Sequence, residues 1–127
     1  MKLTHILYVE DDPDIQFIAR MALEKVGGFT LAICSSGTEA LQKLKTYQPQ
    51  LILLDAMMPD MDGPTTLLAL RQLPQLQETP VLFMTAKVQE QEIKGFKALG
   101  AVDVITKPFD PMTLASKLNQ IWESLPQ

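Results

Sequence analysis

The sequence predicts an α/β protein of five strand–helix units, (βα)₅, with a doubly wound five-stranded parallel sheet. Three observations support this class. Short apolar runs alternate five times with longer amphipathic segments, which is typical of parallel sheets covered by helices. No linker, internal repeat or low-complexity stretch interrupts the alternation. The 127 residues are the size of one domain, and five units are too few to close an eight-stranded barrel.

The first unit is a strand over residues 6–9 followed by a helix over residues 15–26. The strand is a continuous apolar run that ends in acidic residues. The helical segment carries apolar residues three and four positions apart, as one buried helix face requires. Either Asp12 or Asp14 could cap its first turn, and Gly27 is expected to end it.

The second and third units follow the same order. Residues 29–34 form the next predicted strand, and Ser36 opens the next helix. Residues 51–54 are apolar at every position, so they are expected to be buried on both faces in the centre of the sheet. This strand ends at Asp55, and a loop leads to a helix that includes residues 67–73.

The last two units complete the sheet. Residues 80–84 and 101–106 are predicted strands, with a helix over residues 89–99 between them. Asp110 is expected to cap a final helix that includes residues 112–125. The residues of the fourth helix expected to face inward are Ile93, Phe96, Ala98 and Leu99.

Composition limits the classes of function. The formal net charge of −4 argues against direct binding to nucleic acid or to an anionic membrane. Cys34 is the only cysteine, which excludes an intrachain disulfide and a thiolate metal cluster. No apolar run reaches the roughly 20 residues of a membrane helix, and the amino terminus lacks the apolar stretch of a signal peptide. We therefore expect a cytoplasmic protein.

Polar residues stand where four of the predicted strands end, and carboxyl ends of parallel strands share one edge of a sheet. They are Glu10, Asp11, Asp12, Asp55, Thr85 and Lys107. Carboxylates gathered there repel one another unless a cation neutralises them, and oxygen ligands favour a hard ion such as Mg²⁺. A metal ion, a hydroxyl group and an ammonium group together can surround a phosphoryl group. Asp55 is the best candidate for the attacking carboxylate.

Four motifs carry a resemblance to a known family. They are Tyr8-Val9-Glu10-Asp11-Asp12, the run from Leu54 to Gly63, Met84-Thr85-Ala86 and Thr106-Lys107-Pro108-Phe109. In this order and spacing the chain resembles the receiver domain of two-component response regulators, and the similarity covers essentially all of residues 1–127. The resemblance implies a flavodoxin-like sheet with strand order 2-1-3-4-5.

The resemblance also implies a metal site. Asp11 and Asp55 would bind Mg²⁺ or Mn²⁺ directly, and the backbone carbonyl of Met57 would supply a further ligand. Glu10 would support these ligands without touching the ion, or would bind the ion through a water molecule. Asp12, the neighbour of the acidic pair, is expected to cap a helix or to face solvent.

In the resembling family, Asp55 would be the phosphorylated residue in phosphorelay signal transduction. Thr85 and Lys107 would each bind a phosphoryl oxygen, and the peptide bond from Lys107 to Pro108 would be cis. Many members carry Tyr or Phe three residues before the lysine, and its ring reports phosphorylation; Val104 stands here. We therefore expect a weaker conformational response. Met57 and Lys87 occupy positions that tune the lifetime of the phosphoryl group.

The expected function is a phosphoacceptor signalling domain, which at most catalyses its own phosphorylation and dephosphorylation. A sensor histidine kinase or a histidine phosphotransfer protein would be the donor. The output would be a protein target bound by the face of the fourth helix, fifth strand and fifth helix, without nucleic acid or membrane. A stand-alone regulator is favoured, and a fragment of a longer protein stays open.

Three other functions fit the sequence less well. A metal-dependent phosphatase using Asp55 would want a second acid two residues later, where Met57 stands. A flavodoxin-like cofactor binder would want a phosphate-binding loop after the first strand, where residues 11–14 would repel phosphate. A protein-interaction domain independent of phosphorylation would not need Thr85 and Lys107. His5 lies at the wrong end of its strand to be a phosphodonor.

Overall fold

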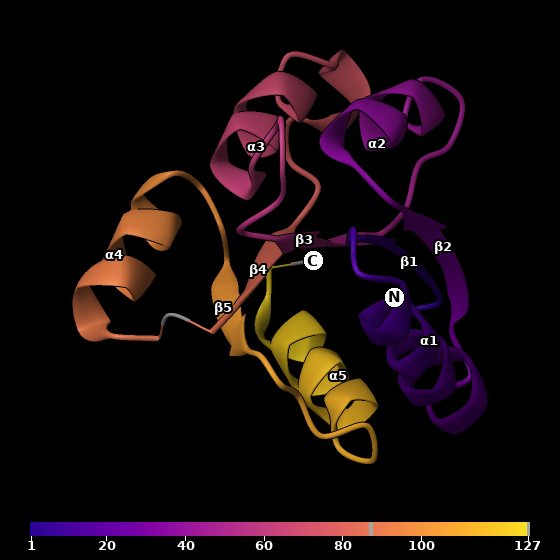
Figure 1. Cartoon of the computed structure of the whole chain (residues 1–127). Helices are drawn as coiled ribbons and strands as arrows, with labels where there is room; N and C mark the ends of the chain where they lie inside the picture. The colour runs from indigo at the N-terminus through magenta and orange to yellow at the C-terminus, as the bar shows by residue number, and fades with distance from the viewer. Residues whose placement is uncertain (87, 127) are drawn as a thin grey trace.

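The structure is a computed structural model of the chain, and it describes residues 1–86 and 88–126. Five parallel strands form one sheet in the order β2-β1-β3-β4-β5, which confirms the predicted fold class and strand order (Figure 1). The strands are β1 (His5–Val9), β2 (Thr30–Cys34), β3 (Leu51–Asp55), β4 (Val81–Thr85) and β5 (Asp103–Thr106).

Helices lie on both faces of the sheet, with α1 and α5 on one face and α2 and α3 on the other (Figure 1). The α-helices are α1 (Pro13–Arg20), α2 (Gly37–Lys43), α3 (Gly63–Leu70), α4 (Glu90–Ala98) and α5 (Leu114–Ser124). A π-helical segment, η1 (Met21–Val26), continues α1, and a short 3₁₀ turn, η2 (Pro74–Leu76), precedes β4. Within the described chain, no helix is long and apolar enough to cross a membrane.

Two apolar cores lie on opposite faces of the sheet, because successive side chains of a strand alternate between faces. Tyr8 and Leu53 face the core under α1 and α5, whereas Leu7 and Leu54 face the core under α2 and α3. Every residue of β3 is buried, as its continuous apolar run predicted. The central strands are thus held from both sides, and their carboxyl ends are fixed relative to one another.

Helix caps explain where several helices begin. The Asp12 side chain accepts from the backbone N–H groups of Asp14 and Ile15, so Asp12 is the cap of α1. Ser36 caps α2 through the N–H of Glu39, as predicted. The single predicted helix over residues 15–26 is only partly right, since its second half is π-helical.

Two further helices differ from the prediction. In α4, Ile93 and Phe96 are half-buried, but Ala98 and the following Leu99 are exposed, so their predicted inward orientation was wrong. The helix contacts the sheet through Phe96, whose ring centroid lies 4.6 Å from that of Phe83, whereas Ala98 and Leu99 lie on the exposed side.

The last helix begins at Leu114, two residues later than predicted. Asp110 does not cap it. Its carboxylate accepts from the N–H of Met112, and its carbonyl accepts from the N–H groups of Thr113 and Leu114. These bonds form a turn before the helix, and Met112 is 68% exposed in that turn.

Candidate functional site

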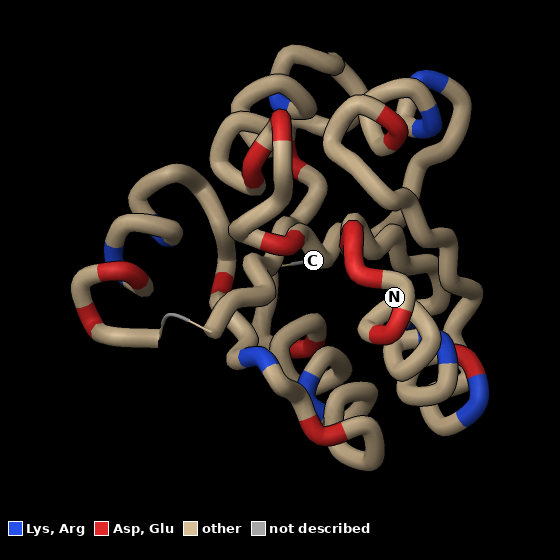
Figure 2. Tube along the Cα trace, in the orientation of Figure 1, with Lys and Arg blue, Asp and Glu red and all other residues tan. Residues whose placement is uncertain are grey.

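Strand alternation brings three charged residues to one face and one edge of the sheet. Tyr8 and Leu53 share the face toward α1 and α5, so residues two positions later, Glu10 and Asp55, continue on that face. Lys107 stands in the same relation to Ile105 of β5. Figure 2 shows the acidic segments that follow β1 and β3 close to one another at this edge.

Lys107 links the two buried acids. Its Nζ atom lies 3.0 Å from Oε1 of Glu10 and 3.3 Å from Oδ2 of Asp55. The side chains of Glu10 and Asp55 are only 1% and 5% exposed, and that of Lys107 is 17% exposed. One ammonium group therefore neutralises carboxylates that arrive from the first and third strands.

Glu10 is held on several sides. The hydroxyl of Tyr8 donates to Oε1 at 3.2 Å, and the backbone N–H of Asp12 donates to Oε2 at 3.1 Å. The Gln16 side chain donates to the Glu10 carbonyl at 2.5 Å, which ties α1 to the end of β1. The carboxylate is thus fixed in one orientation.

Burial and neighbouring charges shift the pKa values of Glu10, Lys107 and Tyr8. Burial raises the pKa of Glu10 above its usual value, although the hydrogen bonds from Lys107 and Asp12 act in the opposite direction. Burial also lowers the pKa of Lys107, but the charges and hydrogen bonds of Glu10 and Asp55 outweigh this and raise it overall. The pKa of Tyr8 is raised by burial and by the neighbouring charge of Glu10.

The loop after β3 fixes Asp55 from its other side. The N–H of Met57 donates to Oδ1 of Asp55 at 3.2 Å, while the Met57 side chain is exposed. Across the edge, the N–H of Lys107 donates to the carbonyl of Thr85 at 2.9 Å. The Lys107–Pro108 peptide bond is cis, as expected.

The acidic cluster has the composition of a hard-cation site. Glu10, Asp11 and Asp55 each offer one carboxylate oxygen, and these atoms lie within 4.8 Å of one another. Asp11 is exposed whereas the other two are buried, so the cluster opens to solvent on the Asp11 side. Such an all-oxygen set suits Mg²⁺, which keeps part of its water shell.

Among the predicted residues, the structure brings together Glu10, Asp11, Asp55 and Lys107, and it buries Thr85 at the end of the neighbouring strand. Lys87 lies outside the described residues. Two residues in contact with Glu10 were missed, namely Tyr8 and Gln16. The sequence did carry a signal for Tyr8, because a residue two positions before Glu10 shares its strand face.

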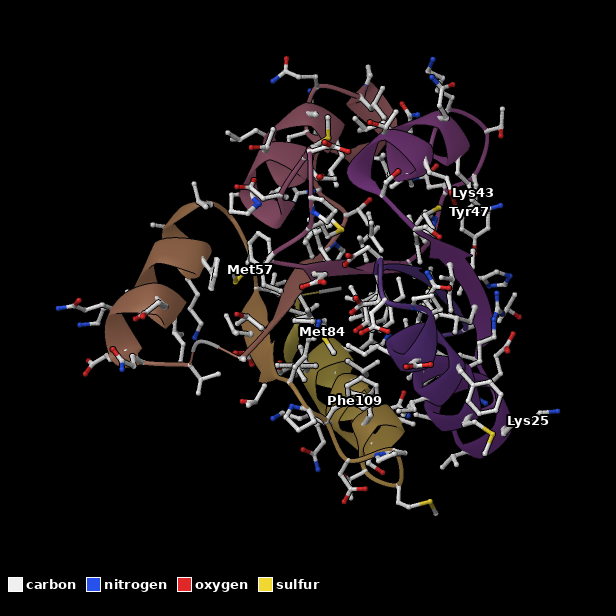
Figure 3. The ribbon with its side chains drawn as sticks, in the orientation of Figure 1. Lys25, Lys43, Tyr47, Met57, Met84 and Phe109 are labelled. Carbon is white, nitrogen blue, oxygen red and sulfur yellow. The ribbon has the colours of Figure 1, made fainter. Side chains whose placement is uncertain are left out.

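An apolar hollow of about 290 Å³ opens beside Lys107, and its lining includes Ile15 and Ile18 of α1. Pro108 and Phe109 form its other wall, and Figure 3 shows Phe109 between α1 and α5. The hollow places apolar surface directly next to the charged cluster.

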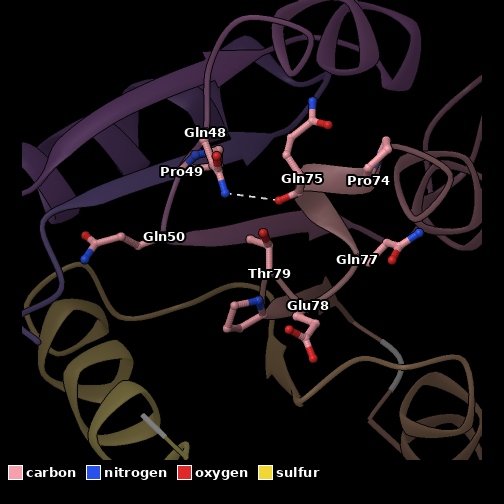
Figure 4. A pocket seen from close by; sticks show the side chains of 9 residues that line it. Gln48, Pro49, Gln50, Pro74, Gln75, Gln77, Glu78 and Thr79 are labelled. Atoms are coloured by element: carbon pink, nitrogen blue, oxygen red, sulfur yellow. Dashed lines mark hydrogen bonds between the residues drawn. The ribbon is translucent and has the colours of Figure 1, made fainter.

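A second cavity, of about 650 Å³, lies at the amino-terminal edge of the sheet (Figure 4). The segments leading into β3 and β4 line it, and the Gln48 side chain donates to the Gln75 carbonyl at 3.1 Å across it. Because Asp55 lies at the other end of β3, this cavity is separate from the candidate site.

A five-stranded sheet of this order with acids, hydroxyl and lysine at its carboxyl edge defines the class of receiver domains. The chain belongs to this class, since residues 6–119 match the family of response regulator receiver domains.

Sequence similarity to individual proteins supports the assignment. The chain is 38% identical to the probable C4-dicarboxylate response regulator DctR of Priestia megaterium, over 91% of this chain and 50% of that protein. It is 33% identical to an uncharacterised 14.6 kDa protein of Leptolyngbya boryana, over 95% of this chain and 92% of that protein. The chain thus spans about half the length of relatives such as DctR.

The fold has close structural counterparts. Chemotaxis protein CheY4 of Vibrio cholerae matches with a TM-score of 0.86 and 29% identity, over 94% of this chain and 98% of that one. Receiver domains of this family are signalling domains rather than classical enzymes.

Replacing Lys107 with Met is expected to lower the free energy of unfolding by about 3 kcal/mol at pH 7.5 without added metal, because two buried carboxylates lose their counter-charge. Losing Lys107 also removes a group that lowers the pKa of Glu10, so this pKa rises further. A folded-state pKa raised above the unfolded value favours folding at low pH. The loss should therefore shrink as the pH falls, because Glu10 then takes up a proton and no longer needs the counter-charge of Lys107.

Urea unfolding followed by the fluorescence of Trp122, which is buried in the core, measures this loss. Lys94→Met is the matched control, since Lys94 pairs with Glu90 on an exposed surface and should change stability little. Equal losses in both variants, or a loss independent of pH, would contradict the prediction.

Proposed function

We propose that the chain, residues 1–127, is one receiver domain that accepts a phosphoryl group onto Asp55 from a phosphohistidine donor and signals through a changed protein-binding surface. The observation that carries the proposal is the contact of Lys107 with both Asp55 and Glu10, at the edge where three carboxylates converge. A capping or purely structural role would not require charged side chains to be buried together.

Each residue has a role in the transfer. An Asp55 carboxylate oxygen forms the new bond to phosphorus, while the bond between phosphorus and the donor's imidazole nitrogen breaks and the imidazole keeps the electron pair. Met57 holds the other carboxylate oxygen through its N–H, which orients the nucleophile. Lys107 turns from the acids to a phosphoryl oxygen, and the Thr85 hydroxyl donates to another.

Mg²⁺ (or Mn²⁺) is the proposed cofactor, because the donor set consists of carboxylate oxygens that can approach one another within 4.8 Å. Asp11 and Asp55 would bind it directly with the carbonyl of Met57, and Glu10 would act through a water molecule or by supporting these ligands. When bound, the ion neutralises charge on the phosphoryl oxygens.

Response regulators interact with histidine kinases, and we propose such a kinase or a histidine phosphotransfer protein as the donor. A donor histidine must reach Asp55 from the open side of the edge. The apolar hollow beside Lys107, together with the exposed Phe17 and Ile18 of α1, offers a surface for that encounter.

The proposed output surface is the face of α4, β5 and α5. All of α4 is described, and none of its residues is fully buried, so this helix is the least anchored of the five. Val104 is half-buried and pairs with Phe83 across the sheet, which leaves it no ring to move. We propose a protein partner, since the net charge of −4 disfavours direct contact with nucleic acid.

The test is incubation of the chain with acetyl phosphate, with and without Mg²⁺, followed by intact-mass measurement. We expect a gain of one phosphoryl group per chain only with Mg²⁺, mapped to Asp55 by borohydride reduction and peptide analysis. No gain, with acetyl phosphate or with a phosphorylated histidine kinase, would overturn the proposal, as would a phosphoryl group on another residue.

A further inference from the structure

Tyr8 places a single hydroxyl group beneath the acidic cluster. Its side chain is fully buried in the core between the sheet and α1 and α5, in the strand adjacent to β3. The other buried residues of β1 are aliphatic, and only Tyr8 adds a polar atom that reaches the carboxyl edge. That hydroxyl donates to Oε1 of Glu10 at 3.2 Å.

The same Glu10 oxygen accepts a second hydrogen bond, from Nζ of Lys107 at 3.0 Å. Lys107 is shared with Asp55 and, in the proposed transfer, is needed by a phosphoryl oxygen. When it leaves, Oε1 keeps one donor, the hydroxyl of Tyr8. Because the ring is packed in the core, this donor stays in place whichever way Lys107 points.

We infer that Tyr8 is a positioning residue, which holds the Glu10 carboxylate in the orientation that supports cation binding at this edge. The inference rests on the proposed function and extends it to a residue that never touches the phosphoryl group. Removing a group that orients a metal ligand through a hydrogen bond typically weakens metal binding by about 10- to 100-fold. Without this hydrogen bond, and with Lys107 turned away, only the N–H of Asp12 at Oε2 would hold the carboxylate, so its orientation would be less fixed before the ion binds.

The experiment compares wild type with Tyr8→Phe, which keeps the ring in the core and removes only the hydroxyl. Calorimetric titration with MgCl₂ is expected to give a Kd about tenfold higher in the variant. The Mg²⁺ concentration that half-saturates phosphoryl incorporation should rise by the same factor, while the rate at saturating Mg²⁺ changes less than about twofold. A purely structural role of Tyr8 would not raise the half-saturating Mg²⁺ concentration while leaving the rate at saturating Mg²⁺ nearly unchanged.

Tyr47→Phe is the matched control, because the Tyr47 hydroxyl is also buried but has no hydrogen-bond partner among the described residues. Its Kd for Mg²⁺ should equal that of wild type. In a Glu10→Gln background, Tyr8→Phe should have no further effect on the Kd, since the two groups act as one unit.

The outcomes separate this inference from the proposed function. If wild type binds no Mg²⁺, the proposed metal site fails and the inference with it. If wild type binds Mg²⁺ and Tyr8→Phe binds it equally well, only the inference is overturned. A tenfold loss that persists unchanged in the Glu10→Gln background would also overturn it.

Discussion

Replacing Asp55 with Asn is expected to abolish phosphoryl incorporation and, without metal, to make the protein more stable. The amide is no nucleophile toward phosphorus under these conditions, so the loss should be complete. Its carbonyl oxygen can still accept the N–H of Met57. Lys107 is then left with Glu10 as one balanced pair, where the wild type places two buried carboxylates against one ammonium group and a third, Asp11, near both of them. Relief of this repulsion should add about 1–2 kcal/mol to the free energy of unfolding.

The sign of the stability change reverses with metal. Mg²⁺ that binds only the folded wild type stabilises it by mass action, and the variant lacks a proposed ligand. In EDTA the melting temperature of Asp55→Asn should therefore exceed that of wild type, and in excess MgCl₂ the gap should close or invert. Asp60→Asn is the matched control, because Asp60 is exposed and has a left-handed φ of 67°, which Asn also adopts readily. It should keep phosphorylation and the Mg²⁺ response.

The edge that carries this chemistry could be predicted from sequence, because it depends on short-range rules. A continuous apolar run identified β3, and the polar residue that ends it identified Asp55. Parallel strands then bring all such ends together. The partner of Lys107 was harder to predict, since the resemblance assigned it to a phosphoryl oxygen. The structure shows its Nζ atom 3.0 Å from Oε1 of Glu10, a distance that depends on how β1, β3, β4 and β5 are ordered across the sheet.

The helix details depend on contacts between distant segments. The π-helical η1 ends at Gly27, where an added Cβ would lie 2.8 Å from the Cβ of Ala115 in α5. Local periodicity carries no information about such a close approach between residues far apart in the chain. The same reason explains α4, whose apolar residues suggested a buried face, although none of its residues is fully buried.

Replacing Gly63 with Ala should also have a large effect on stability, because Gly63 lies against the backbone of the strand that presents Asp55. An added Cβ would lie 2.6 Å from the carbonyl oxygen of Asp55, 2.8 Å from Cα of Ala56 and 2.8 Å from Cε1 of Phe83. Two of these atoms belong to the backbone of a central strand and its exit, so they cannot move without displacing the strand. Gly63→Ala is therefore expected to lower the free energy of unfolding by about 2–3 kcal/mol.

The same substitution should slow phosphorylation more than its effect on stability explains. The N–H of Gly63 donates to the carbonyl of Ala56 at 3.1 Å, which closes the loop that carries Met57 back onto Asp55. Displacing this loop by a fraction of an ångström moves both the proposed nucleophile and a proposed metal ligand, so the rate should fall about tenfold or more in protein that is still folded. Gly95→Ala is the matched control: it lies in exposed α4 with no atom near its added Cβ, and should stabilise by about 0.5–1 kcal/mol. Urea unfolding and acetyl phosphate kinetics on both variants decide the matter. A Gly63→Ala protein as stable and as fast as wild type would mean that the loop after β3 can yield without moving Asp55.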